Sequence, residues 1–303
     1  MLAEINNTLP KNLISLAKKR EPQIVAIVSA HQSITMESAK KAYELNLIDP
    51  IFIGNKLEII EEAEKILWDT SKFTIIDEKN ENEAAKIAAK LARDNEIKVI
   101  VKGNLHTDIL MKAYLKKEYA LIEGKRLSHI WYVTSPKIEK PIFITDGALN
   151  VLPRIDVKMH ILHNVIEFAN RLGIAKPRVA VLSGTEDPIE SMPSSMEAKE
   201  VVERAKKEKI DAYVEGPLAF DNALSLSAAK IKNINNEVAG KADILLMPNL
   251  ETGNAMCKMM VLYMQSCAAG IVVGGKVPVV VPSRADNVIS RVASIAASIV
   301  ASH

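Results

Sequence analysis

Short runs of β-branched residues alternate with longer amphipathic segments along almost the whole chain. The first run, Ile24 to Val28, is followed by a helical pattern from about Ser33 to Leu45, which Ser33 is predicted to cap. Parallel strands need a crossover connection, usually a helix, so this alternation predicts an α/β fold built on parallel strands. The same pattern places further strands near 51–53, 73–76 and 98–101, and helices near 56–67 and 81–93.

The rhythm changes between residues 125 and 152, where two predicted strands are separated by only a polar turn. A long helix from about Asp156 to Leu172, closed by Gly173, then restores the alternation. The strands predicted in this second half lie at 129–134, 141–145, 179–182, 212–214 and 244–247.

We therefore predict two doubly wound α/β domains, one formed by residues 1–138 plus 275–303 and the other by residues 139–274. The last strand, near 277–282, and the last helix, near 286–301, are expected to cross back to the first domain. Ligand sites in α/β proteins commonly lie at strand ends and between domains. The sequence thus predicts an active site in the interdomain cleft.

Composition and charge argue against several classes of partner. Lys and Arg total 39 against 37 for Asp and Glu, so no strong global field would attract nucleic acid. Apolar runs are much shorter than the roughly 20 residues of a membrane-spanning helix, and the first seven residues do not resemble a signal peptide. Cys257 and Cys267 suggest neither a disulfide framework nor a zinc site. We expect a soluble cytoplasmic protein.

The segment from Pro282 to Asp286 follows a predicted buried strand and precedes a helix, so it should emerge at the carboxyl end of a sheet. The Arg284 guanidinium is a planar fork suited to phosphate oxygens, with the Ser283 hydroxyl and the Asp286 carboxylate beside it. This is a candidate anion site. The alternative is that Ser283 or Asp286 only caps the last helix while Arg284 is solvated.

Two other strand ends carry polar residues beside a cation. After the strand near 244–247, Gly253 would let a ligand approach the backbone, and Asn254 and Lys258 share one face of the following helix. The alternative is a capped helix whose methionines pack in the core or at a subunit interface.

After the strand near 98–101, Lys102 and Gly103 precede a helix that Thr107 or Asn104 could cap. Lys102 could neutralise a phosphate, although a surface lysine before a turn explains the pattern equally well. Three strand ends of this kind in one chain favour the functional interpretation.

Other motifs fail on inspection. The stretch Gly270 to Lys276 matches a phosphate-binding loop, but Val277 replaces the required Ser or Thr and a strand follows where a helix is needed. His160 and His163 lie one helical turn apart without an acidic or thiol partner at metal-binding spacing, so we interpret them as helix-surface residues. Cys257 has no evident His partner and is interpreted as a packing residue.

Taken together, the ordered motifs resemble the phosphate acetyl/butyryltransferases, and within them most closely the phosphate butyryltransferase branch. The similarity runs from about Lys98 to the end of the chain. Its most specific stretches are Lys102-Gly103 with Thr107, Leu127–His129 (LSH), Thr145–Asn150 (TDGALN), Met192–Ser195 (MPSS), Glu215–Ala223 (EGPLAFDNA), Ala242–Leu246 (ADILL), Glu251–Asn254 (ETGN) with Lys258, and Ser283–Asp286 (SRAD).

The resemblance implies a homodimer similar in fold to the isocitrate and isopropylmalate dehydrogenases, with coenzyme A and phosphate as substrates and no permanently bound cofactor or metal. It implies catalytic roles for Ser283, Arg284 and Asp286. Arg284 would hold phosphate, Ser283 would assist at the thiol or oxyanion, and Asp286 would be the base. The substrate-binding residues expected on this basis are Lys102, Gly103, Thr107, Asn150, Gly253, Asn254, Lys258 and Lys276.

One departure keeps alternatives open. The acetyl branch uses an aspartate seven positions beyond the serine, and this chain has Ser290 there. A non-catalytic coenzyme A-binding protein of the same fold is therefore an alternative. A dehydrogenase of the related fold ranks last, because neither clustered metal-binding aspartates nor a nicotinamide site is visible. Without an activated Cys or a Ser–His pair, we expect direct acyl transfer in a ternary complex.

Overall fold

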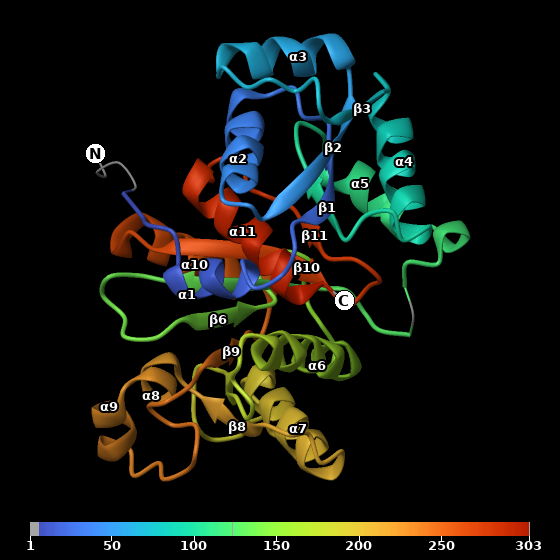
Figure 1. Cartoon of the computed structure of the whole chain (residues 1–303). Helices are drawn as coiled ribbons and strands as arrows, with labels where there is room; N and C mark the ends of the chain where they lie inside the picture. Colours follow the sequence, from blue (N-terminus) through green and yellow to red (C-terminus); the bar gives the residue numbers. More distant parts are fainter. Residues whose placement is uncertain (1–5, 123, 303) are drawn as a thin grey trace. The chain divides into compact units, whose positions relative to one another are not determined.

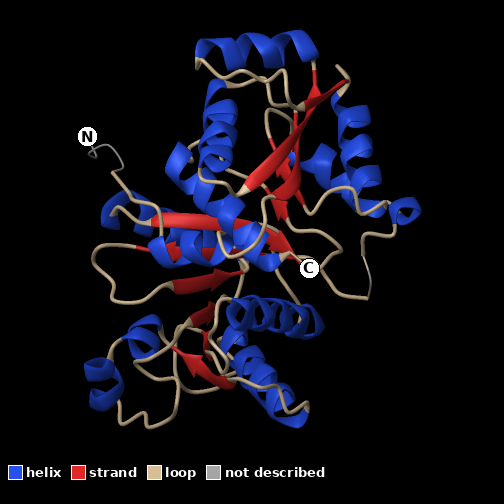
Figure 2. Cartoon of the chain, viewed as in Figure 1, coloured by secondary structure: helices blue, strands red, loops and turns tan. Residues whose placement is uncertain are grey.

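The computed structural model describes residues 6–122 and 124–302 and is a mixed α/β structure, as predicted (Figure 2). The chain forms two compact units. Among the described residues, the terminal unit contains 7–122, 124–125 and 269–302, and the central unit contains 126–268 together with Asn6. Within the described ranges, no helix combines the length and the apolar character needed to cross a membrane. The domain boundaries predicted at residues 138 and 275 remain a prediction and are not taken from these two units.

Six strands form the sheet of the terminal unit, in the order β3-β2-β1-β4-β11-β10. All neighbouring pairs are parallel except β10 and β11, which are antiparallel. The strands are β1 (Gln23–Val28), β2 (Ile48–Gly54), β3 (Thr74–Asp77), β4 (Val99–Lys102), β10 (Cys267–Val273) and β11 (Val279–Val280), with β10 belonging to this unit from residue 269.

The strand order reverses between β1 and β4. From β1 the chain moves outward to β2 and β3, and it then returns to place β4 on the other side of β1. Loops that leave the carboxyl ends of two such strands diverge and leave room for a ligand between them. Because β11 is parallel to β4, its carboxyl end lies at the same edge of the sheet.

Helices cover this sheet with small and branched side chains. Buried alanines line one face of α4, and α11 is buried from Ser290 to Ala301. The last helix contacts α2 and α1, which lie beside it in Figure 1. The helices of the unit are α1 (Lys11–Ala17), α2 (Ser33–Glu44), α3 (Lys56–Lys65), α4 (Glu81–Arg93), α5 (Thr107–Tyr114) and α11 (Val288–Ala301), with a 3-10 turn at Lys117–Tyr119.

The central unit has strand order β5-β6-β9-β7-β8, and only β5 and β6 pair antiparallel. This antiparallel pair is the hairpin predicted where the strand–helix alternation stops. Its strands are β5 (Ser128–Thr134), β6 (Ile142–Thr145), β7 (Arg178–Leu182), β8 (Tyr213–Leu218) and β9 (Ile244–Leu246). Its helices are α6 (Ile155–Arg171), α7 (Pro193–Lys207), α8 (Phe220–Leu224), α9 (Leu226–Ile231) and α10 (Leu250–Met264).

Several predicted element ends were wrong. Ser33 does not cap α2, because Gln32 occupies the N-cap position and the Ser33 hydroxyl donates to the Glu37 carboxylate at 2.6 Å. The strand expected at 277–282 is reduced to Val279–Val280. Gly173 does close α6, with a φ of 89° that suits a glycine.

Candidate active site

The loop between β11 and α11 is a closed turn. The Ser283 amide donates to the Asp286 carboxylate at 2.8 Å, and the Asp286 amide donates back to the Ser283 carbonyl at 3.1 Å. The helix is instead capped by Asn287, whose side chain accepts a hydrogen bond from the Ser290 amide at 3.0 Å. The alternative interpretation of Ser283 or Asp286 as the helix cap is therefore wrong, since Asn287 has that role.

The side chains presented by this turn are open to ligands. Ser283 and Arg284 are exposed. The described residues offer the Arg284 guanidinium no hydrogen bond or ion pair that would fix it. A guanidinium without an anionic partner near the start of a helix can bind an oxyanion by donating two parallel hydrogen bonds to it.

Lys102 ends β4 and is half-buried. Its ammonium donates to the carbonyls of Leu105 at 2.8 Å and Gly103 at 3.2 Å. Burial lowers the pKa of Lys102, and the positive charges of Arg291 and Arg284 lower it further. These three side chains thus place like charges near one another, an arrangement that an anionic ligand would stabilise.

Gly103 is required by the close approach of two turns. A Cβ at this position would lie 2.3 Å from the Ser29 carbonyl oxygen and 2.6 Å from that of Val28. The Gly103 amide donates to Val28 and the Asn104 amide to Ser29, both at 2.7 Å. Because Gly103 has no side chain, the backbone after β4 can pack against the end of β1, at the point where the strand order reverses.

The predicted caps of α5 were wrong. His106 occupies the N-cap position without a side-chain hydrogen bond, and Thr107 is the exposed first residue of the helix. Asn104 instead contacts the β1–α2 turn: Gln32 Nε2 donates to Asn104 Oδ1 at 2.6 Å, and Asn104 Nδ2 lies 3.1 Å from His31 Nε2. The β1–α2 turn thus contacts the loop after β4, a contact that the sequence does not predict.

Arg291 was not among the site residues predicted from the sequence. It is 6% exposed, and its guanidinium donates to the carbonyls of Asp286 and Ser283, each at 3.1 Å. A signal was present, because Arg291 is the one charged residue in α11. A charge within an apolar helix is costly unless it has partners, so it indicates a specific contact.

In the central unit, the loop after β6 is organised around Asp146, which is 2% exposed. One carboxylate oxygen accepts from the amides of Ala148 and Leu149, both at 2.9 Å. The other accepts from the His129 amide at 2.9 Å and from Asn150 Nδ2 at 2.7 Å. Asn150, predicted to bind substrate, thus holds this loop in shape.

His129 lies beside this carboxylate within the protein interior. Burial lowers the pKa of His129 from its usual 6.5 to about 4, and the nearby Asp146 carboxylate opposes the shift. The imidazole is therefore neutral at physiological pH, and it packs edge-on against Trp131 with ring centroids 4.5 Å apart.

The start of α10 lies against the same loop. Asn249 caps the helix by accepting from the Thr252 amide at 2.9 Å. A Cβ on Gly253 would lie 2.9 Å from the Cα of Gly147, and Asn254 Nδ2 donates to the Gly147 carbonyl at 3.0 Å. Gly253 and Asn254 thus join helix and loop, while Lys258 is exposed one turn further along α10.

The structure brings together only part of the predicted set. In the terminal unit, the Ser283–Asp286 turn and Lys102-Gly103 share the carboxyl edge of β4 and β11. Lys276 precedes β11 and so lies at its amino end, where its ammonium donates to the Arg93 carbonyl at 2.6 Å. In the central unit, Asn150, Gly253 and Asn254 meet at one loop.

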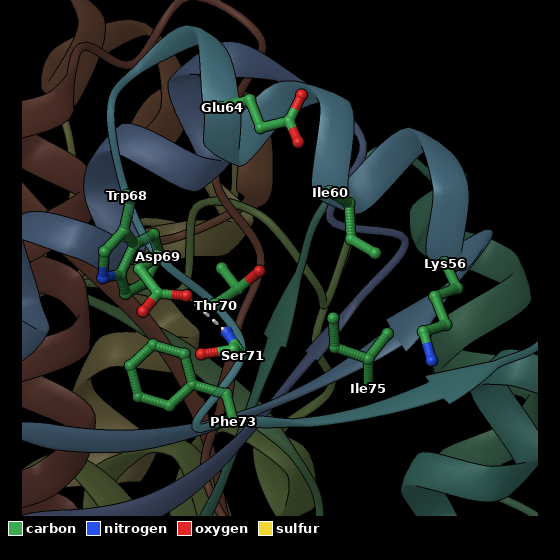
Figure 3. Close-up of a pocket in the computed structure, with 9 residues that line it drawn as sticks. All are labelled: Lys56, Ile60, Glu64, Trp68, Asp69, Thr70, Ser71, Phe73 and Ile75. Carbon is green, nitrogen blue, oxygen red and sulfur yellow. Dashed lines mark hydrogen bonds between the residues drawn. The ribbon is translucent and has the colours of Figure 1, made fainter.

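A cavity of about 290 Å³ lies elsewhere in the terminal unit, at the edge strand β3 (Figure 3). Ile60 and Ile75 face it, and Asp69 accepts a hydrogen bond from the Ser71 amide at 2.9 Å beside it. It is lined by Lys56, Ile60, Glu64, Trp68, Asp69, Thr70, Ser71, Phe73 and Ile75. None of the predicted site residues is among them, and β2 and β1 separate β3 from β4.

The motifs set aside on sequence grounds have structural roles. Gly270 to Lys276 leads from β10 through a turn towards β11, so no helix follows it. Cys257 is 2% exposed and packs in the apolar core of the central unit, as predicted. His163 Nε2 lies 3.2 Å from the Glu208 carboxylate on the protein surface.

Comparison with known proteins identifies the family. Residues 78–299 match the family model described as Phosphate acetyl/butaryl transferase. The chain is 38% identical to the phosphate acetyltransferase of Rickettsia typhi, over 93% of this chain and 82% of that protein. It is 36% identical to the phosphate butyryltransferase of Clostridium acetobutylicum, over 94% and 95% of the two chains. Relatives of similar identity thus carry both names.

Solved structures agree with the sequence comparison. A branched-chain phosphotransacylase from Enterococcus faecalis superposes with a TM-score of 0.82 at 30% identity, covering 92% of this chain and 98% of that one. A putative 4-hydroxythreonine-4-phosphate dehydrogenase from Salmonella typhimurium, 12% identical, shares the fold with a TM-score of 0.60 over 92% of this chain and 99% of that one. This confirms the predicted likeness to dehydrogenase-type α/β folds. The chain belongs to the phosphate acetyl/butyryltransferase family.

Proposed function

We propose that the protein transfers a short acyl group between the thiol of coenzyme A and inorganic phosphate. The observation that carries this proposal is that three cations lie at the carboxyl edge of β4 and β11: Lys102 ends β4, Arg284 lies in the turn after β11, and Arg291 donates to two carbonyls of that turn. An exposed, unneutralised guanidinium among them suits a phosphoryl group. The names of the relatives support the same reaction.

The proposed chemistry follows from the turn. Arg284 holds the phosphoryl oxygens while the thiolate of coenzyme A attacks the acyl carbonyl. A carbon–sulfur bond forms, the bond from the acyl carbon to the phosphate oxygen breaks, and phosphate leaves. A free thiol has a pKa of about 8.5, so a base must help it ionise. We assign that role to Asp286, whose carboxylate also fixes the Ser283 amide, and the Ser283 hydroxyl stabilises the oxyanion.

We propose binding roles for the remaining predicted residues. Thr107 and Lys258 are exposed, and Lys258 would attract the phosphates of coenzyme A. Gly103, Gly253, Asn150 and Asn254 would act by shaping the loops that a substrate contacts. Lys276 is the weakest member of this set, because its ammonium already donates to a carbonyl.

A thioester cleavage assay tests the function. Purified protein is expected to release coenzyme A from acetyl, propionyl, butyryl or isobutyryl thioesters only when phosphate is present. Each substrate is measured with and without phosphate, and with sulfate as the control anion. Coenzyme A binding without phosphate-dependent cleavage would select the non-catalytic alternative. The assay also ranks the acyl chains, and steady-state patterns distinguish direct transfer from a ping-pong mechanism.

A homodimer formed through the central unit is part of the proposal. The outer face of α10 exposes Met259, Leu262 and Tyr263, which are 46%, 40% and 62% exposed. Contiguous apolar side chains on a helix surface commonly mark a protein interface.

Replacing Leu262 by glutamate is expected to convert a dimer into monomer, because a charge would be buried in the contact. Sedimentation velocity measures the mass, and Leu67→Glu, at a residue 89% exposed in the terminal unit, is the matched control. A wild-type protein that sediments as a monomer, or an unchanged L262E dimer, would contradict this assignment.

We also place the protein in the cytoplasm, where coenzyme A thioesters and acyl phosphates are produced and consumed. Cell fractionation, followed by detection of the protein in the soluble or the membrane fraction, tests this placement.

A further inference from the structure

Arg291 connects the last helix to the candidate catalytic turn. Its Nε donates to the Asp286 carbonyl and its Nη2 to the Ser283 carbonyl, both at 3.1 Å. The two carbonyls are the first and the last of the turn that carries Arg284. The Arg291 guanidinium therefore bridges the two ends of the turn, and Arg284 lies between them in the sequence.

The position of Arg284 depends on this backbone. The Arg284 side chain is exposed and has no fixed partner among the described residues. The backbone of the turn therefore sets the position and direction from which this side chain extends. The turn has three internal hydrogen bonds: the Ser283 amide donates to the Asp286 carboxylate, the Asp286 amide to the Ser283 carbonyl, and the Ala285 amide to the Ser283 hydroxyl at 3.4 Å. Arg291 adds two more and ties the turn to a helix that is buried from Ser290 onward.

Arg291 is itself held in place. It is 6% exposed and borders, with Thr35, Ser38 and Pro282, a void of only about 10 Å³. The guanidinium thus has no room to swing away from the two carbonyls. Its positive charge also reaches the ligand edge of the sheet, because it lowers the pKa of Lys102.

We propose that Arg291 is a positioning residue, which orients the Ser283–Asp286 turn so that Arg284 and Ser283 meet the phosphoryl group. This inference rests on the proposed function. A lysine has one ammonium nitrogen and cannot reproduce the planar fork that reaches two carbonyls. An experiment can therefore separate the effect of the positive charge of Arg291 from the effect of its guanidinium on the orientation of the turn.

Arg20 provides a matched control at the other end of the same helix. Its guanidinium donates to the carbonyls of Ile299, Val300 and Ser302 at 2.7, 3.1 and 2.8 Å. Like Arg291, it ties α11 to the rest of the terminal unit through backbone acceptors. It lies at the opposite end of α11 from the Ser283 turn, so it reports only the effect of loosening the helix.

The experiment compares Arg291→Lys and Arg291→Met with Arg20→Lys and Arg20→Met. Both Arg291 variants are expected to lose about tenfold or more in kcat/KM for phosphate, since a small misplacement of a binding group has effects of this order. The KM for the acyl thioester should change little. Both Arg20 variants should keep kcat/KM for phosphate within about twofold, a change that is small in free energy. Thermal unfolding of all four variants reports folding, and Arg291→Lys, which keeps charge and bulk, serves if Arg291→Met does not fold.

Two outcomes would overturn the inference. Wild-type kcat/KM in Arg291→Lys would mean that charge suffices, and an equal loss in Arg20→Met would mean that helix stability is the cause. Failure of the proposed function is separate, because it would appear as an inactive wild-type protein. Calorimetric titration with inorganic phosphate then decides the question: Arg291→Lys must bind phosphate more weakly than Arg20→Lys, and equal affinity refutes the positioning role.

Discussion

Arg284→Ala is expected to lower phosphate-dependent acyl transfer by about 10²- to 10³-fold, the loss typical of removing a charged group that stabilises the transition state. The variant should unfold at the wild-type temperature, because Arg284 is exposed and no contact among the described residues depends on its guanidinium. Initial rates at varied phosphate, together with thermal unfolding, measure both quantities.

Two further variants sharpen this test. Arg284→Lys keeps the charge but not the bidentate fork and should recover only part of the rate. Arg204→Ala removes a partly exposed arginine of α7 that pairs with Asp156, and it should leave the rate unchanged. Wild-type turnover in Arg284→Ala would remove Arg284 from the mechanism and, with it, the proposed role of the β11–α11 turn.

Asp146→Ala should lower the free energy of unfolding by about 3–5 kcal/mol, because it removes a buried carboxylate and leaves the buried His129 amide and three part-buried donors without their acceptor. Four hydrogen bonds end on this carboxylate: the amides of His129, Ala148 and Leu149 and the side chain of Asn150. Urea unfolding followed by circular dichroism measures the change.

Asp156→Ala is the control for Asp146→Ala. This carboxylate lies in the same unit, is 82% exposed and pairs with Arg204, so its loss should cost less than about 1 kcal/mol. Equal effects of the two substitutions would contradict the role of Asp146 as the organising acceptor of the loop. Wild-type stability in Asp146→Ala would contradict it as well.

The alternation of short β-branched runs with longer helical patterns was sufficient to predict most of the fold. The parallel strands follow from these runs, and the hairpin at β5 and β6 follows from two runs with only a polar turn between them. Helix starts were less predictable, because several adjacent residues can cap. Ser283, Asp286 and Asn287 are all good capping residues, and the structure selects Asn287 because Asp286 already binds the Ser283 amide.

The site was predictable only where its residues follow strand ends. Ser283, Arg284 and Lys102 share an edge because β4 and β11 are parallel neighbours. Lys276 has similar chemistry, but it lies before its strand rather than after it, a difference that the motif alone does not reveal. Arg291 and Asp146 were missed because their importance arises from three-dimensional hydrogen bonding to distant or turn-forming backbone groups.

The insertion of β11 beside β4 affects how the chain can fold during its synthesis. Residues 7–125 leave the ribosome long before β11 does, so the β4 edge is left unpaired while the central unit is translated. Unpaired strand edges promote aggregation. Residues 126–268 of the central unit form one continuous stretch that can fold meanwhile, whereas we expect the nascent terminal sheet to need shielding until β11 emerges.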